Sequence, residues 1–103
     1  MNKVVIVTGA SRGIGAATAK KLAEQGYAVC VNYRAQSEAA HQVVRDIQAN
    51  GGKAIAVQAD VSDEQQVLNL FDATENALGS VTHLVNNVGI LFTQSPLAEI
   101  SLE

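Results

Sequence analysis

A short glycine-rich segment near the start of the chain is the first feature whose residue types suit a chemical task. Gly9, Gly13 and Gly15 lie between a β-branched apolar run, residues 3–8, and a stretch of helix formers, residues 16–25. Such a strand-to-helix turn presents free backbone N–H groups and the positive end of a helix, which both attract phosphate. Glycines serving only the tight turn and helix packing are the alternative. The spacing is not G-x-G-x-x-G, so the prediction of a nucleotide phosphate site depends on this context.

The end of the second apolar run carries no carboxylate. Domains that bind NAD usually place Asp or Glu there, about 20 residues beyond the glycine loop, where it binds the ribose hydroxyls and repels a 2′-phosphate. Asn32 stands at this position, and Arg34 supplies a guanidinium whose geometry suits a phosphate. Arg12, just before Gly13, is expected to face the same region. These residues predict that NADP is preferred over NAD. The alternative is a solvated Arg34 and use of both cofactors.

An alternation of strand and helix patterns must position these residues. Strands are expected over residues 3–8, 28–31, 53–58 and 81–85. The first helix, residues 16–25, is followed by two amphipathic helices whose core faces carry Ala40, Val43, Val44 and Ile47, and then Val67, Leu70, Phe71, Thr74 and Leu78. With right-handed crossovers, this alternation predicts an α/β fold with a doubly wound parallel sheet of the Rossmann type, in the order 3-2-1-4.

Helix and chain ends carry further signals. Gly26 and Gly79 are expected to end the first and third helices, and Ser62 with Gln65 is expected to form a capping box that begins the third. From Ile90 the pattern thins into a loop, and residues 101–103 suggest the start of another helix. Residues 1–103 are therefore predicted to form the N-terminal part of a single dinucleotide-binding domain, truncated after the fourth strand. That strand would then be an exposed edge prone to pairing.

The amino-acid composition limits the classes of molecule that this protein is expected to bind. The chain has 103 residues, 48% of them hydrophobic and 17% charged, which suits one domain with a continuous core. The formal charge of −3, without a basic run, argues against nucleic acid or an anionic membrane as partner. The only cysteine, Cys30, excludes an intrachain disulfide and a multi-cysteine metal site, and it is expected to be buried. No signal peptide or membrane span is predicted, so the expected location is the cytoplasm.

Three segments together resemble the short-chain dehydrogenase/reductase family over essentially the whole chain. They are Thr8-Gly9-x-x-x-Gly13-x-Gly15, Asp60-Val61 after the third strand, and Asn86-Asn87-Val88-Gly89 after the fourth. Each motif alone is weak, whereas their order and spacing together are highly specific. The resemblance is strongest to bacterial glucose dehydrogenases and 3-oxoacyl carrier-protein reductases.

The resemblance implies roles for individual residues. The three loop glycines would line the pyrophosphate, and Ser11, Arg12 and Ile14 would shape the loop between them. Asp60 would bond the adenine amino group, and Val61 would stack beside the ring. Asn86 and Asn87 would brace the central sheet, and Gly89 would leave room for the nicotinamide-side ribose. The predicted cofactor-binding residues are therefore Gly9, Ser11, Arg12, Gly13, Ile14, Gly15, Asn32, Arg34, Asp60, Val61, Asn87 and Gly89.

Two positions depart from the family pattern. Val88 replaces the usual alanine, which adds bulk near the cofactor but no polarity. Thr82 stands where relatives often carry an aspartate near the adenine pocket. His41 is expected to be solvated and His83 to be packed within the fourth strand, so neither is expected to act as a catalytic base.

Catalytic residues are not assigned in this chain, and neither are metal ligands. The family uses a tyrosine with a lysine four residues later, whereas Tyr27 and Tyr33 are followed at that spacing by Val31 and Ser37. The resemblance therefore implies an NADP-dependent oxidoreductase that transfers hydride between nicotinamide and a small carbonyl or alcohol substrate. This chain would be its inactive cofactor-binding half, and the full-length protein is expected to be a homo-oligomer. The alternatives are a non-catalytic dinucleotide-sensing module and a flavodoxin-like mononucleotide-binding domain, which Asn-Asn-x-Gly disfavours.

Overall fold

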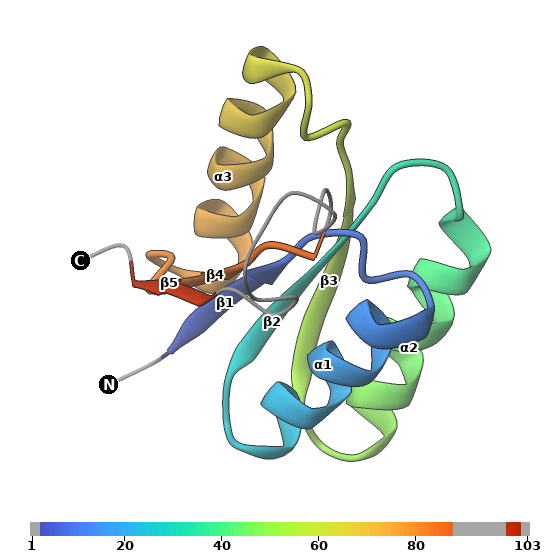
Figure 1. Ribbon diagram of the computed structural model, residues 1–103. Helices are drawn as coiled ribbons and strands as arrows, with labels where there is room; N and C mark the ends of the chain where they lie inside the picture. Colours follow the sequence, from blue (N-terminus) through green and yellow to red (C-terminus); the bar gives the residue numbers. More distant parts are fainter. Residues whose placement is uncertain (1–2, 88–98, 102–103) are drawn as a thin grey trace.

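The sheet of this protein is assembled from strands that alternate with helices along the chain. The computed structural model describes residues 3–87 and 99–101. Its elements are β1 (Val4–Val7), α1 (Gly13–Glu24), β2 (Ala28–Tyr33), α2 (Ser37–Ala49), β3 (Lys53–Gln58), α3 (Glu64–Leu78), β4 (His83–Val85) and β5 (Glu99–Ser101) (Figure 1). The third strand has the predicted bounds, whereas the fourth begins two residues later than the pattern suggests.

The five strands lie in the order β3-β2-β1-β4-β5. The pairs β1–β2, β2–β3 and β1–β4 are all parallel. This arrangement confirms the predicted doubly wound parallel sheet and its order 3-2-1-4. Because parallel neighbours need a crossover, each strand from β1 to β4 is followed or preceded by a helix that crosses one face of the sheet.

Two predictions about the end of the chain are wrong. Strand β4 is not an exposed edge, because β5 pairs with it in antiparallel orientation, with Leu84 opposite Ile100. Ser101 belongs to β5 and lies opposite His83, so it does not begin a helix. Pairing of backbone N–H and C=O groups along the open side of β4 favours a strand here over an isolated helical turn. The predicted loop after Ile90 and residues 102–103 lie outside the described residues.

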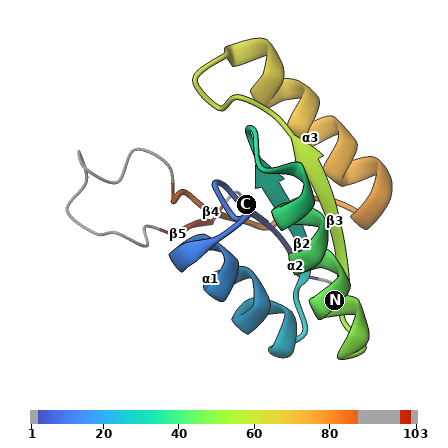
Figure 2. The ribbon, with the colours of Figure 1, turned by 90° about the vertical axis from the view of Figure 1, so that its right-hand side faces the viewer.

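Helices cover both faces of the sheet. Figures 1 and 2 show α1 and α2 on one face and α3 on the other. Alternate residues of β1 divide between the two cores: Val5 and Val7 pack on the α1 and α2 side, and Val4 and Ile6 on the α3 side. This two-sided burial explains the continuous apolar runs in the sequence. The predicted core positions of α2 are all buried, namely Ala40, Val43, Val44 and Ile47.

The glycines predicted to end helices do so, but the predicted start of α3 is displaced. Gly26 and Gly79 follow α1 and α3 with φ of 97° and 109°, values that favour glycine. The N-cap of α3 is Asp63, whose carboxylate accepts bonds from the backbone N–H groups of Gln65 and Gln66. Ser62 does not cap the helix, because its hydroxyl donates to Asp60 Oδ1 over 2.6 Å. The predicted capping box is therefore wrong by one residue.

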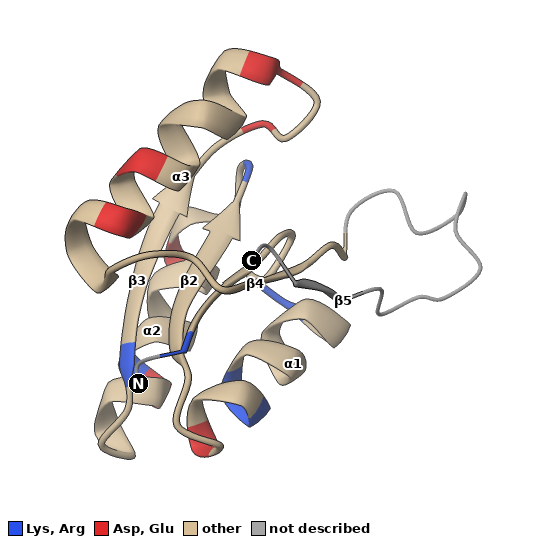
Figure 3. Cartoon of the chain, turned by 90° about the vertical axis from the view of Figure 1, so that its left-hand side faces the viewer, with Lys and Arg blue, Asp and Glu red and all other residues tan. Residues whose placement is uncertain are grey.

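Charge is unevenly distributed over this fold. All seven lysines and arginines lie at or before Lys53 in the sequence. The basic residues lie on α1 and the loop before it, on α2, on the strand ends and on the loop after β2, whereas α3 and the loop before it carry acidic residues and no basic one (Figure 3). These acidic residues are Asp60, Asp63, Glu64, Asp72 and Glu75. In the described part of the chain, no helix is both long and apolar enough to cross a bilayer.

The buried cysteine gives a first prediction. Cys30 is fully buried in β2, and burial raises the pKa of its thiol to about 11. The thiol therefore stays protonated at about pH 8 and is shielded from reagents. We expect iodoacetamide to leave the folded protein unmodified and to label Cys30 fully in guanidinium chloride, as read by intact-mass spectrometry. Because the chain has a single cysteine, rapid stoichiometric labelling of the folded protein would contradict this assignment.

Candidate functional site

A cleft opens at the carboxyl edge of the parallel strands, where loops from different parts of the chain meet. Its volume is about 450 Å³. Five of the residues predicted to bind a cofactor line it: Gly9, Asn32, Arg34, Asp60 and Val61. Ser11, Arg12, Gly13, Ile14, Gly15 and Asn87 do not line the cleft itself; they belong to the glycine loop, to the start of α1 and to the end of β4. Gly89 and Val88 lie outside the described residues.

The glycine loop folds back onto the first turn of α1. Gly9 and Gly13 have φ of 58° and 64°, in the left-handed region that favours glycine. Glycine is favoured at Gly15 for a different reason, which is lack of space. A Cβ atom there would lie 2.3 Å from Gly9 O and 2.8 Å from Asn87 Nδ2. A side chain at Gly15 would therefore push the loop away from the helix.

The amino end of α1 is suited to bind an anion. The helix begins at Gly13, its N-cap residue Arg12 makes no side-chain capping bond, and its first turn holds no acidic residue. Arg12, Gly13 and Ile14 are exposed, with Ile14 at 55%. The backbone N–H groups of such a turn lack helical partners and carry the positive end of the helix dipole. Together with the close-packed glycine backbone, this arrangement fits the pyrophosphate of a dinucleotide.

Asn32 fixes the glycine loop to the sheet. Its side chain is buried, and its Oδ1 accepts a hydrogen bond from Gly9 N over 3.3 Å. Its Nδ2 donates to Val57 O and Ala59 O, each over 3.3 Å, so the amide also reaches the end of β3. From the sequence, Asn32 was of interest only for its missing charge. The structure shows in addition why an aspartate would not fit: a carboxylate cannot donate to the two carbonyls.

The end of β4 also braces the loop. Thr8 N donates to Val85 O over 3.0 Å, and the Thr8 hydroxyl accepts a bond from Asn87 N over 2.8 Å. Asn87 Nδ2 donates to Gly9 O over 3.4 Å. Asn87 Oδ1 is buried and accepts no hydrogen bond from the described part of the chain. The bracing role that the resemblance implies for this segment thus corresponds to specific contacts, in which Thr8 takes a part that the sequence did not indicate.

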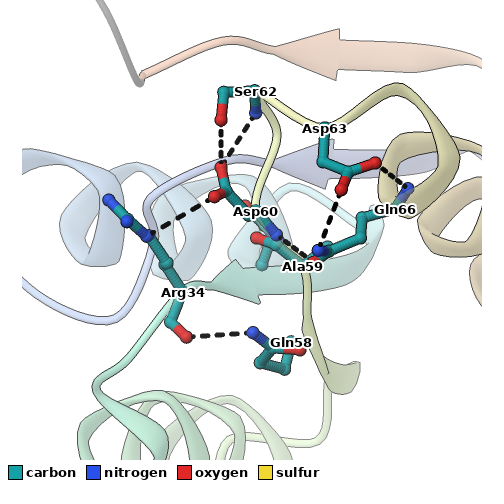
Figure 4. A network of polar contacts seen from close by, with 8 residues as sticks. Arg34, Gln58, Ala59, Asp60, Ser62, Asp63 and Gln66 are labelled. Carbon is teal, nitrogen blue, oxygen red and sulfur yellow. Dashed lines mark hydrogen bonds and ion pairs between the residues drawn. The ribbon is translucent and has the colours of Figure 1, made fainter.

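Arg34 and Asp60 meet at the rim of the cleft. Arg34 Nε lies 3.8 Å from Asp60 Oδ2, and the Arg34 side chain is 79% exposed (Figure 4). Asp60 Oδ1 accepts bonds from the hydroxyl and the backbone N–H of Ser62, over 2.6 and 3.0 Å. These bonds, and secondarily the charge of Arg34, hold the pKa of Asp60 below its usual value. Asp60 is therefore a carboxylate at neutral pH.

Apolar side chains form the remaining wall of the cleft. Val67, Leu70 and Phe71 of α3 and Leu84 of β4 line it beside Val61. The three α3 residues were predicted to lie on the core face of their helix, and no contact with a ligand was predicted for them. Their position in the first half of the helix was the available signal, because α3 starts near the carboxyl ends of the strands. A flat apolar group such as a nucleobase suits this wall.

The remaining candidates lie away from the cleft. Thr82 bonds Val4 at the amino end of β1, through its hydroxyl and its backbone N–H, so its expected place near the adenine pocket is wrong. His83 packs edge-on against Tyr27 and His41 is exposed beside Tyr33, which agrees with the predicted packed and solvated positions of the two rings. Within residues 3–87 and 99–101, no group of three or more His, Cys, Asp or Glu residues could hold a metal ion.

The close packing at Gly15 predicts a loss of stability on substitution. We expect Gly15→Ala to lower the free energy of unfolding by about 1–3 kcal/mol, because the added methyl group overlaps the Gly9 carbonyl. Denaturant unfolding measures this change. Ala17→Ser, which also adds one heavy atom but at an exposed position of the same helix, is the control and should cost no more than about 0.5 kcal/mol. Equal losses of stability in the two variants would show that the close approach of Gly15 to the Gly9 carbonyl does not exclude a side chain at this position.

The bonds of Asn32 predict that a buried carboxylate is not tolerated. We expect Asn32→Asp to lower the free energy of unfolding by about 3 kcal/mol at neutral pH, because the charge faces two carbonyl oxygens. Burial would raise the pKa of this aspartate, so the loss should shrink as the pH falls through that value. Urea unfolding over a range of pH tests this, with the exposed Asn69→Asp as control. A pH-independent or negligible loss would contradict the assignment.

Known proteins are similar to this chain in sequence and in fold. A profile of the family described as short chain dehydrogenase matches residues 3–103. The chain is 48% identical over 100 residues to the uncharacterized oxidoreductase YgfF of Escherichia coli (strain K12), a match that covers 97% of this chain and 40% of that protein. It is 52% identical over 88 residues to a 3-oxoacyl-[acyl-carrier-protein] reductase of Synechocystis, covering 85% of this chain and 36% of the reductase.

Solved structures agree with these sequence matches. A 7 alpha-hydroxysteroid dehydrogenase complexed with NADH and 7-oxo glycochenodeoxycholic acid superposes with a TM-score of 0.79 at 41% identity, covering 82% of this chain and 33% of that one. The chain thus spans 40% or less of the length of these relatives. The flavodoxin-like alternative is excluded by the family match over residues 3–103. As its glycine, Asp-Val and Asn-Asn segments predict, the chain belongs to the short-chain dehydrogenase family.

Proposed function

We propose that this chain is the cofactor-binding part of an oxidoreductase that uses NADP to reduce a small carbonyl compound or oxidise the corresponding alcohol. The observation that carries the proposal is the cleft at the carboxyl edge of the sheet. Gly9 of the glycine loop, the apolar wall and Arg34 all border this cleft, and the glycine loop leads on into the uncapped amino end of α1. The end of β2, where a carboxylate would oppose a 2′-phosphate, holds the neutral and fully bonded amide of Asn32.

Each part of a dinucleotide would contact residues of suitable chemistry in the glycine loop or the cleft. The backbone of Gly9, Gly13 and Gly15 would hold the pyrophosphate. Val61 and the apolar wall would contact the adenine ring, and the Asp60 carboxylate would accept a bond from its amino group. The guanidinium groups of Arg34 and Arg12, together with Ser11 and Ile14 in the loop, would shape the region around the adenosine ribose. Asn87 and Gly89 are proposed to border the nicotinamide side.

Relatives support the class of reaction. One is a 3-oxoacyl-[acyl-carrier-protein] reductase, and another forms a complex with NADH and a 7-oxo steroid. A bound nicotinamide supplies or accepts the hydride, and the protein contributes binding and orientation. The printed sequence contains no Tyr-x-x-x-Lys pair, so we propose that this part of the protein binds cofactor without turning over substrate. A dinucleotide-sensing module without catalysis remains the second candidate, since it would use the same cleft.

Substitution of the two arginines tests the choice of cofactor. For the intact protein we expect kcat/KM to be higher with NADP than with NAD. We expect Arg34→Ala combined with Arg12→Ala to reduce that preference about tenfold, because Arg34 is largely exposed and its contact with phosphate is partly screened. Arg45→Ala is the matched control, since this exposed arginine of α2 bonds only Gln42 among the described side chains.

Three outcomes separate the alternatives. A preference for NAD in the unaltered protein, or an NADP preference that survives loss of both arginines, would show that Arg34 and Arg12 do not bind the 2′-phosphate. Equal rates with NADP and NAD would favour a protein that uses both cofactors. Tight binding of NADP without oxidation or reduction of any carbonyl or alcohol by the intact protein would favour the sensing module.

A further inference from the structure

Two contacts hold Arg34, and both come from the end of β3. Gln58 Nε2 donates a hydrogen bond to the backbone carbonyl of Arg34 over 3.2 Å. Asp60 Oδ2 lies 3.8 Å from Arg34 Nε. Figure 4 shows the two contacts on opposite sides of Arg34, one at its main chain and the other at its guanidinium. The residue is therefore contacted at both ends, at its main chain by β3 and at its guanidinium by the loop that follows β3.

The sheet itself does not require the contact from Gln58. Regular pairing of β2 with β3 ends at Tyr33 opposite Gln58, and Ala59 N donates to Tyr33 O just beyond it. The Gln58 side chain extends this pairing by one residue, to the carbonyl of Arg34. Gln58 is exposed, and exposed polar contacts contribute little to global stability. Its effect is therefore local, on the position of Arg34.

The other anchor is itself held in place. Ser62 binds Asp60 Oδ1 twice, and Gln66 Oε1 accepts a bond from Asp60 N over 2.8 Å. The carboxylate is thus fixed where it faces Arg34 Nε. Figure 4 shows the two terminal nitrogens of the guanidinium turned away from Asp60. Because a guanidinium has five N–H donors in a planar fork, its terminal pair can bind a dianion while Nε stays beside the carboxylate.

We propose that Gln58 is a positioning residue for cofactor selection: with Asp60 it holds Arg34 so that the terminal guanidinium nitrogens are ready for a 2′-phosphate. This proposal rests on the proposed role of Arg34. A free arginine side chain loses its rotamer freedom when it binds a phosphate, and anchoring it beforehand reduces that cost. A ligand without a 2′-phosphate does not use Arg34 in this way. The contribution of Gln58 is therefore confined to ligands that carry the group.

Calorimetric binding to the intact protein separates these two kinds of ligand without a catalytic assay. The probes are adenosine 2′,5′-bisphosphate and 5′-AMP, which differ only in the 2′-phosphate. We expect Gln58→Ala to weaken binding of the bisphosphate about three- to tenfold and to leave 5′-AMP binding unchanged. Gln58→Met, which keeps the length of the side chain but has no donor, should do the same. Gln42→Ala, another exposed and hydrogen-bonded glutamine, should change neither affinity.

A double-mutant comparison shows whether Gln58 acts through Arg34. In the Arg34→Ala background, Gln58→Ala should have no further effect on bisphosphate binding. Additive losses, or equal losses for both ligands, would overturn the positioning role. If Arg34→Ala removes the preference for the bisphosphate and neither Gln58 variant does, this inference is wrong and the proposed function stands. If Arg34→Ala itself has no effect on that preference, the proposed role of Arg34 is wrong, and this inference is wrong with it.

Discussion

The buried amide of Asn32 is the contact on which the rest of the cleft depends. This side chain joins the glycine loop after β1, the end of β2 and the end of β3 in a single set of hydrogen bonds. Ala10 N adds a bond to the Asn32 backbone carbonyl over 2.8 Å. In the apolar surroundings of the sheet such bonds are strong, and leaving any of their partners unpaired is costly. With the loop fixed in this way, the first turn of α1 can pack through Gly15 against Gly9, a residue that lines the cleft.

Most of the fold could be predicted from the sequence because its signals are local. Apolar runs, helical periodicity and terminal glycines indicate strands and helices wherever both faces of a sheet are covered, as around Val5, Val29 and Val43. Two local signals were misleading. Ser62 satisfies the capping pattern but donates its hydroxyl to Asp60, and Ser101 suggests a helix start but pairs with β4. In both cases a partner distant along the chain, or a competing acceptor, outweighs local preference.

The site is less predictable than the fold because its contacts join residues that are far apart in sequence. Glycines 9, 13 and 15, Asp60 and Val61 are recognisable as a set through their types and order. Nothing in the sequence indicates that Asp60 faces Arg34 or that Gln58 reaches the Arg34 carbonyl. Only the position of Phe71 in the first half of α3 points to its place in the cleft. These contacts follow from the register of β2 with β3 and from the angle of α3, which depend on the packed core. Resemblance to a family supplies the residue types at a site, whereas the geometry must come from the structure.

The separation of charge across the cleft has a consequence for how a ligand arrives. Arg34 stands on the β2 side, where Asp60 lies beside it, whereas the remaining acidic residues of this region belong to the start of α3 and to α3 itself, which has no basic residue. An anionic molecule near this edge is attracted toward one wall and repelled from the other, so it experiences a torque as well as a pull. The orientation of the encounter is then partly set before any contact forms. Screening acts over about 8 Å at physiological ionic strength, so this steering operates mainly over the last molecular diameter of the approach. A chain with net negative charge can in this way still attract an anion toward one side of the cleft.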